Sequence, residues 1–330
     1  MKFKHLFSLA ALSLMASATF TSCEDILGHW EKPTSITPTP SEPEDKSGSG
    51  LLAGKFTING SGDQVQFSQG NLQATTNDLG ATWTWAFAEH QWDYIGGTID
   101  ASDASATTNN KINDDGTVPV NGTVDLFGWV GASNTTWTGA AIYGISKSKT
   151  SSDYGTNATE ALKSDWGTNM VPAGWRTLTS AEWTYLFSTR ETGGTVFSTE
   201  KARYAHATIN TDGTGVNGII LFPDGVDIES SEVTTWGAVN STSAYATKCT
   251  SVQWTALEAK GCVFLPAAGY RNGSSVKDAG SDGYYWSSSP YNSAGYAYYT
   301  YFFSANLFTS DTYTGRGFGF SVRLVRDVAE

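Results

Sequence analysis

The sequence predicts an α+β fold, built of antiparallel sheets with two main helices and many loops. The predicted elements run strands, helix, strands, helix, strands, without the regular β-α-β alternation that accompanies parallel sheets. Aromatic residues make up 13% of the 330 residues and charged residues only 16%, which is typical of a globular chain rich in β-structure. The net charge of −12 argues against nucleic acid and anionic membrane surfaces as partners.

The N-terminus has the features of an export signal. Lys2 and Lys4 precede an apolar run, 6–20, that is too short to cross a bilayer as a stable helix. A basic start, a short apolar core and small residues are typical of a secretory signal. Cys23 follows directly and resembles the lipidated cysteine of a lipobox, although Phe20 stands where Leu is usual. A plain signal peptide with an incidental cysteine is the alternative.

We therefore divide the chain into three parts. Residues 1–22 are expected to be a lipoprotein signal peptide, and residues 23–50 a lipidated cysteine with a flexible tether of Pro, Ser, Thr, Glu and Gly. Residues 51–330 are expected to form a single ligand-binding domain. These features predict an outer-membrane, surface-exposed lipoprotein that meets the membrane only through its lipid anchor.

Several strands are visible before the first helix. Residues 55–58 and 64–67 alternate apolar with polar side chains, and Asn59–Asp63 supplies a turn between them. Trp83, Trp85 and Phe87 also alternate with smaller residues, as in a half-buried strand. A later apolar run, 263–265, predicts a short strand, and 269–273 predicts a turn.

Two capping boxes predict where the helices begin. Thr179 and Glu182 open a helix that carries Trp183 on its apolar face and ends near Arg190. Thr250 and Gln253 open a second helix, which carries Trp254 and Leu257 and stops at Gly261.

The C-terminal stretch is the candidate functional region. Eight of the fifteen tyrosines lie between Tyr284 and Tyr313, and from Gly283 to Phe320 only Asp311 and Arg316 carry charge. Tyr with Ser, Gly and Asn is the composition of antibody binding loops, where Tyr gives large contact area at low entropic cost. Tyr299, Tyr301 and Phe303 share one face of a strand, and we expect that face to be substantially exposed while Thr300 and Phe302 turn inward.

We accordingly predict a binding surface for a protein or glycan. Its expected contact residues are Tyr296, Tyr299, Tyr301, Phe303, Phe308 and Tyr313, with Asn306, Asp311 and Arg316 as polar partners. The alternative is a structural envelope or pilus-tip protein in which the aromatic strands form the core.

One segment resembles a known family. Residues 174–186, GWRTLTSAEWTYL, are similar to the G-x-R-L-P-T-E-A-E-W-E-Y signature of formylglycine-generating-enzyme-like domains, a branch of the C-type lectin fold. The matching positions are Gly174, Arg176, Thr179, Ala181, Glu182, Trp183 and Tyr185. Residues 319–323 resemble the closing strand of that family. The strand expected at 320–325 alternates, with Phe320, Val322 and Leu324 on one side and Ser321, Arg323 and Val325 on the other. The resemblance implies a C-type-lectin-like domain in which Glu182 has a structural role.

The chain also resembles a large group of bacterial surface lipoproteins. They share FSQGNLQ at 67–73, FAEHQWDYIG at 87–96, FLPAAGYR at 264–271 and YWSSS at 285–289. Some proteins of the lectin-like fold are variable proteins of diversity-generating retroelements, and ordinary Tyr-rich strands are the alternative. If that likeness holds, the residues expected to be rewritten are Gly295, Tyr299, Tyr301, Phe303, Phe308, Asp311, Thr312 and Tyr313.

The sequence offers little for catalysis, and we expect neither enzymatic activity nor a cofactor. The enzymes of the resembled family use paired cysteines for copper or clustered histidines for iron. Here Cys249 and Cys262 flank a helix about 15 Å long, too far apart for a disulfide, so both thiols are expected to be unpaired. His90 and His206 are too few for a metal site. Residues 113–116 lack the spaced acidic residues and closing Glu of a calcium loop.

Overall fold

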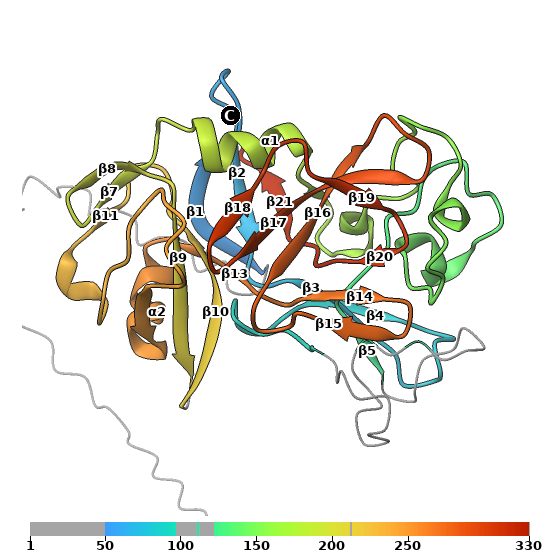
Figure 1. Cartoon of the computed structure of the whole chain (residues 1–330), viewed down its shortest axis with the longest axis horizontal. Coiled ribbons are helices and arrows are strands. Elements are labelled where there is room, and N and C mark those ends of the chain that lie inside the picture. The colour runs from blue at the N-terminus through green and yellow to red at the C-terminus, as the bar shows by residue number, and fades with distance from the viewer. Residues whose placement is uncertain (1–49, 97–109, 111, 113–121, 212, 330) are drawn as a thin grey trace, which may run out of the picture. The chain divides into compact units, whose positions relative to one another are not determined.

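The computed structural model describes residues 50–96, 110, 112, 122–211 and 213–329 (Figure 1). The described residues belong to one unit that extends from Asp45 to Glu330. Two predicted parts of the chain lie outside the described residues: the signal peptide, and Cys23 with nearly all of its tether. Residues 113–116, which lack the pattern of a calcium loop, also lie outside them. No helix within the described ranges is both long enough and apolar enough to cross a membrane.

The described strands form six small sheets, and nearly all neighbouring strands are antiparallel, so the α+β prediction is confirmed (Figure 1). The first sheet has the order β1 (Leu51–Thr57), β2 (Gln64–Ser68), β21 (Leu324–Asp327) and β6 (Trp175–Thr177). The second has the order β12 (Thr247–Thr250), β9 (Tyr204–Thr211), β10 (Thr214–Leu221) and β13 (Val263–Pro266). The third contains β11 (Asp227–Ile228), β7 (Gly194–Val196) and β8 (Thr199–Ala202).

Three further sheets complete the described fold. One contains β15 (Ser275–Lys277), β14 (Tyr270–Asn272) and β20 (Phe318–Gly319). Another contains β4 (Thr84–Phe87), β3 (Leu72–Thr75) and β5 (Thr123–Val124). The last contains β16 (Gly283–Pro290), β17 (Tyr296–Phe303), β18 (Asn306–Phe308) and β19 (Tyr313–Gly315). Among the described strands, the parallel pairs are β7 with β11 and β9 with β12.

The first hairpin follows its sequence pattern. In β1 and β2, Phe56 pairs with Val65, and both are fully buried. The Asn59 side chain accepts hydrogen bonds from the backbone of Ser61 (3.0 Å) and Asp63 (3.2 Å), which fixes the turn. The late strand β21 pairs with β2, so the two ends of the domain meet in one sheet.

Both predicted capping boxes are present. Thr179 accepts from the Glu182 backbone while the Glu182 carboxylate accepts from the Thr179 backbone, and α1 (Ser180–Thr184) begins there. A π-helical turn, Tyr185–Thr189, continues α1 as far as Arg190. The second box opens α2 (Ser251–Ala259), after which Gly261 adopts φ +89°. Short 3-10 helices lie at Gly139–Tyr143, Ser151–Tyr154, Trp166–Asn169 and Ser230–Glu232.

The apolar side chains gather in three clusters. The first joins α1 to the sheets through Trp183, which is fully buried as predicted and lies against Phe187, Phe67 and Tyr285. The second includes Trp286 of β16 and Ala297 at the start of β17. The third covers α2 and β9.

The predicted closing strand differs from its pattern. Phe320 and Ser321 form isolated bridges, residues 322–323 belong to no strand, and β21 begins only at Leu324. Phe320, Val322 and Leu324 are buried as expected, but Ser321, Arg323 and Val325 are buried as well. This segment passes between packed elements on both sides, so alternation did not separate a core face from a wet face.

Arg271 lies within a predicted turn that proves to be a hairpin of β14 and β15. Its guanidinium is fully buried and donates to the backbone carbonyls of Leu126, Gly144, Ser146 and Gly273 at 2.6–3.2 Å. Peptide oxygens therefore compensate this buried charge, and the contact joins three separate segments of chain.

Candidate ligand-binding surface

The C-terminal tyrosine stretch folds into the sheet of β16, β17, β18 and β19, with β17 at its centre. Residues directly opposite each other in antiparallel strands place their side chains on the same face. Tyr284 of β16 faces Tyr301 of β17, and Tyr301 in turn faces Phe308 of β18. The register therefore brings aromatic residues from three strands together.

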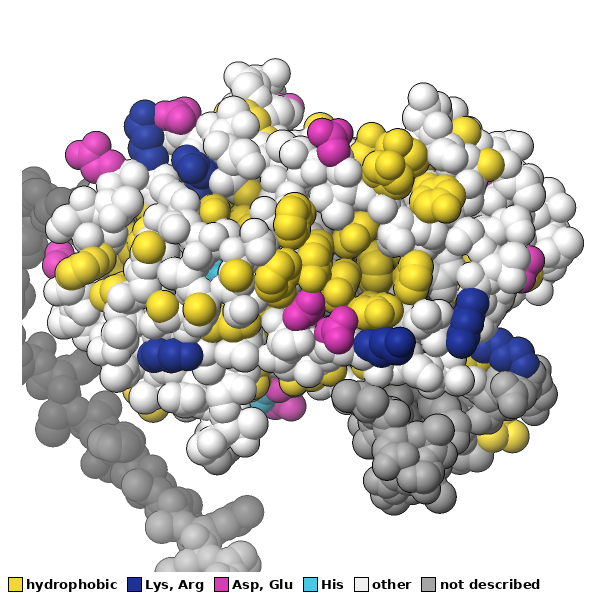
Figure 2. Space-filling model, viewed as in Figure 1, with side chains coloured by type: hydrophobic (Ala, Val, Ile, Leu, Met, Phe, Trp, Pro, Cys, Tyr) yellow, Lys and Arg dark blue, Asp and Glu magenta, His cyan; other side chains and the backbone are white. Residues whose placement is uncertain are grey.

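These side chains form a row that we call the aromatic ladder: Tyr284, Tyr299, Tyr301, Phe303 and Phe308. The rings of Tyr284 and Tyr301 stack at 4.5 Å and 20°, and those of Tyr301 and Phe308 at 5.7 Å and 7°. Phe303 extends the row beside Tyr301 and Phe308. Figure 2 shows apolar side chains gathered on this face of the molecule, over the strands β16, β17 and β18 of Figure 1.

The predicted exposure of the ladder is met in part. Thr300 and Phe302 turn inward, as expected, and Phe302 stacks on Tyr285 in the first cluster. Tyr299, Tyr301 and Phe303 face the other way, but each is half-buried rather than substantially exposed. Tyr299 in particular rests on Phe320, with 4.8 Å between the ring centroids.

Two carboxylates border the ladder. The Tyr301 hydroxyl donates to Asp282 at 2.8 Å, and the Tyr284 hydroxyl lies 3.4 Å from Asp282 and 3.5 Å from Asp278. Burial, then the hydrogen bond to Asp282, raises the pKa of Tyr301 to about 12, and burial raises the pKa of Tyr284 as well. Both hydroxyls therefore keep their protons at neutral pH.

A second aromatic group lies at the start of β17. We call Tyr291, Tyr296, Tyr298 and Tyr313 the tyrosine cluster. Tyr291 and Tyr313 stack at 3.5 Å, and Tyr296 and Tyr313 are 40% and 43% exposed. At this end of β17, Tyr296 and Tyr298 face outward, and Ala297 between them is buried in the second apolar cluster.

The buried side of β17 thus changes along the strand. A register shift between Trp286 and Pro290 interrupts its pairing with β16, and such irregularities increase local twist. The predicted surface is therefore two groups: Tyr299, Tyr301, Phe303 and Phe308 in the ladder, and Tyr296 and Tyr313 in the tyrosine cluster.

Arg316 is not a surface contact, which corrects the prediction. Its guanidinium is fully buried, pairs with Glu160 and lies 4.5 Å from the Trp129 ring centroid. It also donates to the Tyr296 carbonyl at 3.0 Å. Arg316 therefore holds the base of β19 against a distant segment, and neither Glu160 nor Trp129 was singled out in the sequence.

The remaining predicted polar residues stay near the surface. Asn306 is half-buried opposite Phe303 in the β17–β18 hairpin, and Asp311 is exposed at φ +55°. Gly295, expected to be rewritten, is a poor position for a side chain. It is buried at φ +77°, and an added Cβ would lie 3.2 Å from Ser151.

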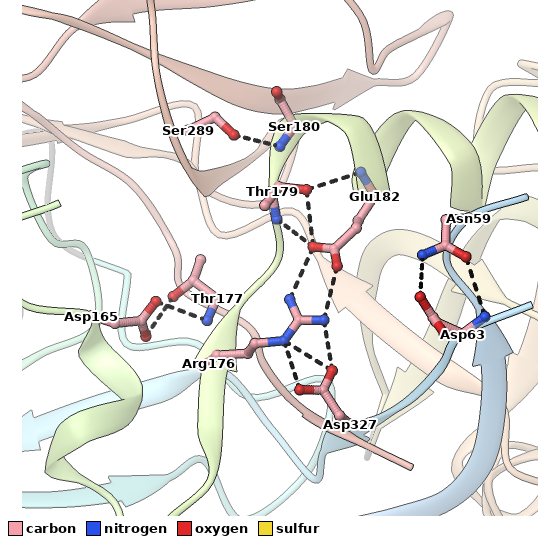
Figure 3. A network of polar contacts seen from close by, with 10 residues as sticks. All are labelled: Asn59, Asp63, Asp165, Arg176, Thr177, Thr179, Ser180, Glu182, Ser289 and Asp327. Carbon is pink, nitrogen blue, oxygen red and sulfur yellow. Dashed lines mark hydrogen bonds and ion pairs between the residues drawn. The ribbon is translucent and has the colours of Figure 1, made fainter. Parts of the chain in front are cut away.

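The family-like motif builds a separate polar network (Figure 3). The Arg176 guanidinium donates to both carboxylate oxygens of Glu182 at 2.8 and 2.9 Å, and it also pairs with Asp327 at 2.7 Å. Asn59 and Asp63 line the same hollow, which has a volume of about 530 Å³. Every charged group of Arg176 and Glu182 is engaged, so this network joins β6, α1 and the C-terminal strand.

The cysteines and the histidine of the domain core are buried. Cys249 and Cys262 are unpaired and buried, as predicted, and burial raises the pKa of both thiols, that of Cys249 to about 12. Buried thiols of this kind are poor nucleophiles. Burial also lowers the pKa of His206 to about 4. The described residues contain no group of three or more His, Cys, Asp or Glu that could hold a metal ion.

Comparison with known proteins adds one finding. Residues 237–325 match a family model described as a domain of unknown function, DUF8237, which covers the ladder, the tyrosine cluster and Arg316. No curated protein and no solved structure matches the chain.

Proposed function

We propose that this protein is a non-enzymatic, surface-displayed lipoprotein whose aromatic ladder binds a protein or glycan ligand outside the cell. The observation that carries the proposal is a continuous, half-exposed row of five aromatic side chains contributed by three strands. Contiguous exposed apolar surface is uncommon on monomeric proteins and usually marks an interaction site.

The ring geometry favours a protein ligand. A sugar packs against the open face of an aromatic ring, but the faces of Tyr284, Tyr301 and Phe308 are stacked on one another. Such a row presents ring edges and hydroxyl groups, with the Asp282 carboxylate beside them. Aromatic edges and polar tips are typical of protein interfaces, where tyrosine is enriched.

Three finer assignments belong to the same proposal. A C-type-lectin-like fold is supported by the Arg176–Glu182 pair and the capping box, which use the residues of the resembled motif. An outer-membrane anchor at Cys23 is supported by the sequence pattern alone. Diversification by a retroelement is supported by the exposed positions of Phe308, Asp311 and Tyr313.

A binding experiment on intact cells tests the proposal. Labelled full-length protein is added to a panel of bacterial cells, with and without protease treatment of those cells. We expect binding that protease treatment removes, and we expect Tyr299→Ala combined with Tyr301→Ala to abolish it while leaving the circular dichroism spectrum unchanged. The matched control is Phe197→Ala, since Phe197 is 51% exposed and lies outside the strands of the ladder.

Two results would contradict the proposal. A folded double variant that binds like the wild type would show that the ladder is not the contact surface. An equal loss of binding in Phe197→Ala would show that any exposed aromatic side chain supports adhesion.

A further inference from the structure

A hollow of about 340 Å³ lies between the first helix and the loop that follows β18. Its lining residues are Ser180, Ala181, Thr184, Tyr185, Thr189, Tyr298, Thr309, Ser310 and Asp311. We call it the α1 groove. It touches the tyrosine cluster at Tyr298 and contains no residue of the aromatic ladder. Its volume lies at the small end of the roughly 300–1,000 Å³ of ligand pockets.

The lining is hydroxyl-rich and almost uncharged. Five of the nine residues are Ser or Thr, two are Tyr, and Asp311 is the single charged one. An anionic ligand would meet one carboxylate and no cation there. An apolar ligand would leave these hydroxyls without water or a partner, at a cost in free energy. A neutral ligand with many hydroxyl groups is not repelled by the carboxylate, and it can form hydrogen bonds with the lining hydroxyls.

The walls of the α1 groove are held in place before any ligand arrives. The capping box of Thr179 fixes the start of α1 on one side. On the other side, the Thr184 hydroxyl bonds to the Thr309 carbonyl, and the Ser188 and Thr309 hydroxyls lie 3.3 Å apart. A preformed site avoids the entropic cost of ordering its walls on binding.

Several groups that line the groove remain available to a ligand. Among the described residues, no hydrogen bond engages the Asp311 carboxylate or the hydroxyls of Tyr185 and Tyr298. An ionised carboxylate accepts from two adjacent hydroxyls of a sugar ring, and a tyrosine ring packs against its C–H bonds.

We infer that the α1 groove binds a neutral pyranose sugar, with Asp311 accepting from vicinal hydroxyl groups and Tyr185 or Tyr298 packing on the ring. This site is independent of the ladder, so it stands or falls separately from the proposed function.

The test uses the full-length protein with named probes: the methyl glycosides of glucose, galactose, mannose and N-acetylglucosamine, and N-acetylneuraminic acid as the anionic comparison. Saturation-transfer NMR titrations measure binding. We expect at least one neutral glycoside to bind with a Kd on the order of 1 mM, as few hydrogen bonds and one ring contact allow. The anionic sugar should not bind.

Two variants locate the binding. Ala181→Trp fills the groove from an exposed helix position, so the fold should be retained, as an unchanged Tm would show. Asp311→Ala removes the carboxylate. Each should weaken binding about tenfold or more, which is the size of effect expected when a polar recognition group is lost. Tyr299→Ala with Tyr301→Ala should leave sugar binding unchanged.

The inference is overturned if none of the neutral glycosides binds, or if binding survives both groove variants. Loss of sugar binding in the ladder variant, with both groove variants unaffected, would instead assign the sugar to the ladder. Loss of cell binding in the ladder variant bears only on the proposed function.

Discussion

His206 should make the stability of this protein depend on pH in a way that one substitution removes. The imidazole is fully buried on β9 among Tyr204, Tyr245 and Phe302, and neither ring nitrogen has a hydrogen-bond partner in the part of the chain that the structure describes. Burial lowers the pKa of His206 to about 4, from an unfolded value of about 6.5. Between pH 4 and pH 6.5, His206 is therefore protonated in the unfolded chain and neutral in the folded chain.

The magnitude follows from linkage. Because the unfolded state binds more protons over this range, the free energy of unfolding falls as pH drops through 6.5 and approaches its floor near pH 4. The lost stability is about 2 kcal/mol at pH 5 and about 3 kcal/mol at pH 4, relative to pH 7. Above pH 6.5, His206 is neutral in both states and its protonation no longer lowers the free energy of unfolding.

The measurement is urea denaturation of the wild type and His206→Leu at several pH values from 7 to 4. The two proteins must be compared because other groups also titrate in this range. Burial raises the pKa of Asp125 to about 6, so the ionisation of Asp125 lowers the free energy of unfolding as pH rises. We expect the variant to lose about 3 kcal/mol less than the wild type on going from pH 7 to pH 4. Parallel pH profiles for the two proteins would refute the reasoning, whatever their absolute stabilities.

Three further outcomes are expected. Trp183→Ala should cost about 3–5 kcal/mol in urea denaturation, as for other large aromatic residues removed from cores, and near-wild-type stability would mean that the helix is not anchored there. Arg316→Leu should cost about 3–5 kcal/mol because it leaves Glu160 buried and unpaired; adding Glu160→Leu should restore much of the loss, and no recovery would count against the ion pair. Cys23→Ser should move the protein from the membrane fraction to the soluble fraction, whereas unchanged fractionation would contradict lipidation.

Local patterns predicted the elements well. The capping boxes at Thr179 and Thr250 place both helices because each box satisfies backbone groups within four residues of chain. The alternation around Phe302 correctly predicted which side of β17 turns inward at that end. Such signals are contained in the segment itself, so the rest of the fold is not needed to interpret them.

The errors at the candidate surface arise from contacts between distant segments. Arg316 looked like a surface orienter because its partner, Glu160, lies 156 residues earlier in the chain. The change of buried side along β17 depends on two separate apolar clusters, at Ala297 and at Phe302, which no local period reports. Tyr284 was omitted from the expected contacts because its place in the ladder follows from strand register, although its position in the tyrosine-rich stretch was a usable signal.

The hydrogen bonds of Arg271 have a consequence for which substitutions the protein can accept. The acceptors at Leu126, Gly144, Ser146 and Gly273 are peptide oxygens, which every amino acid carries, so the bonds themselves do not depend on those side chains. Other contacts restrict three of the four positions: Leu126 is fully buried, and Gly144 and Gly273 adopt φ +81° and +66° with no room for a Cβ. Only the half-buried Ser146 is left to vary. A library that randomises Ser146 should therefore keep many folded members, whereas randomising Arg271 itself should keep few.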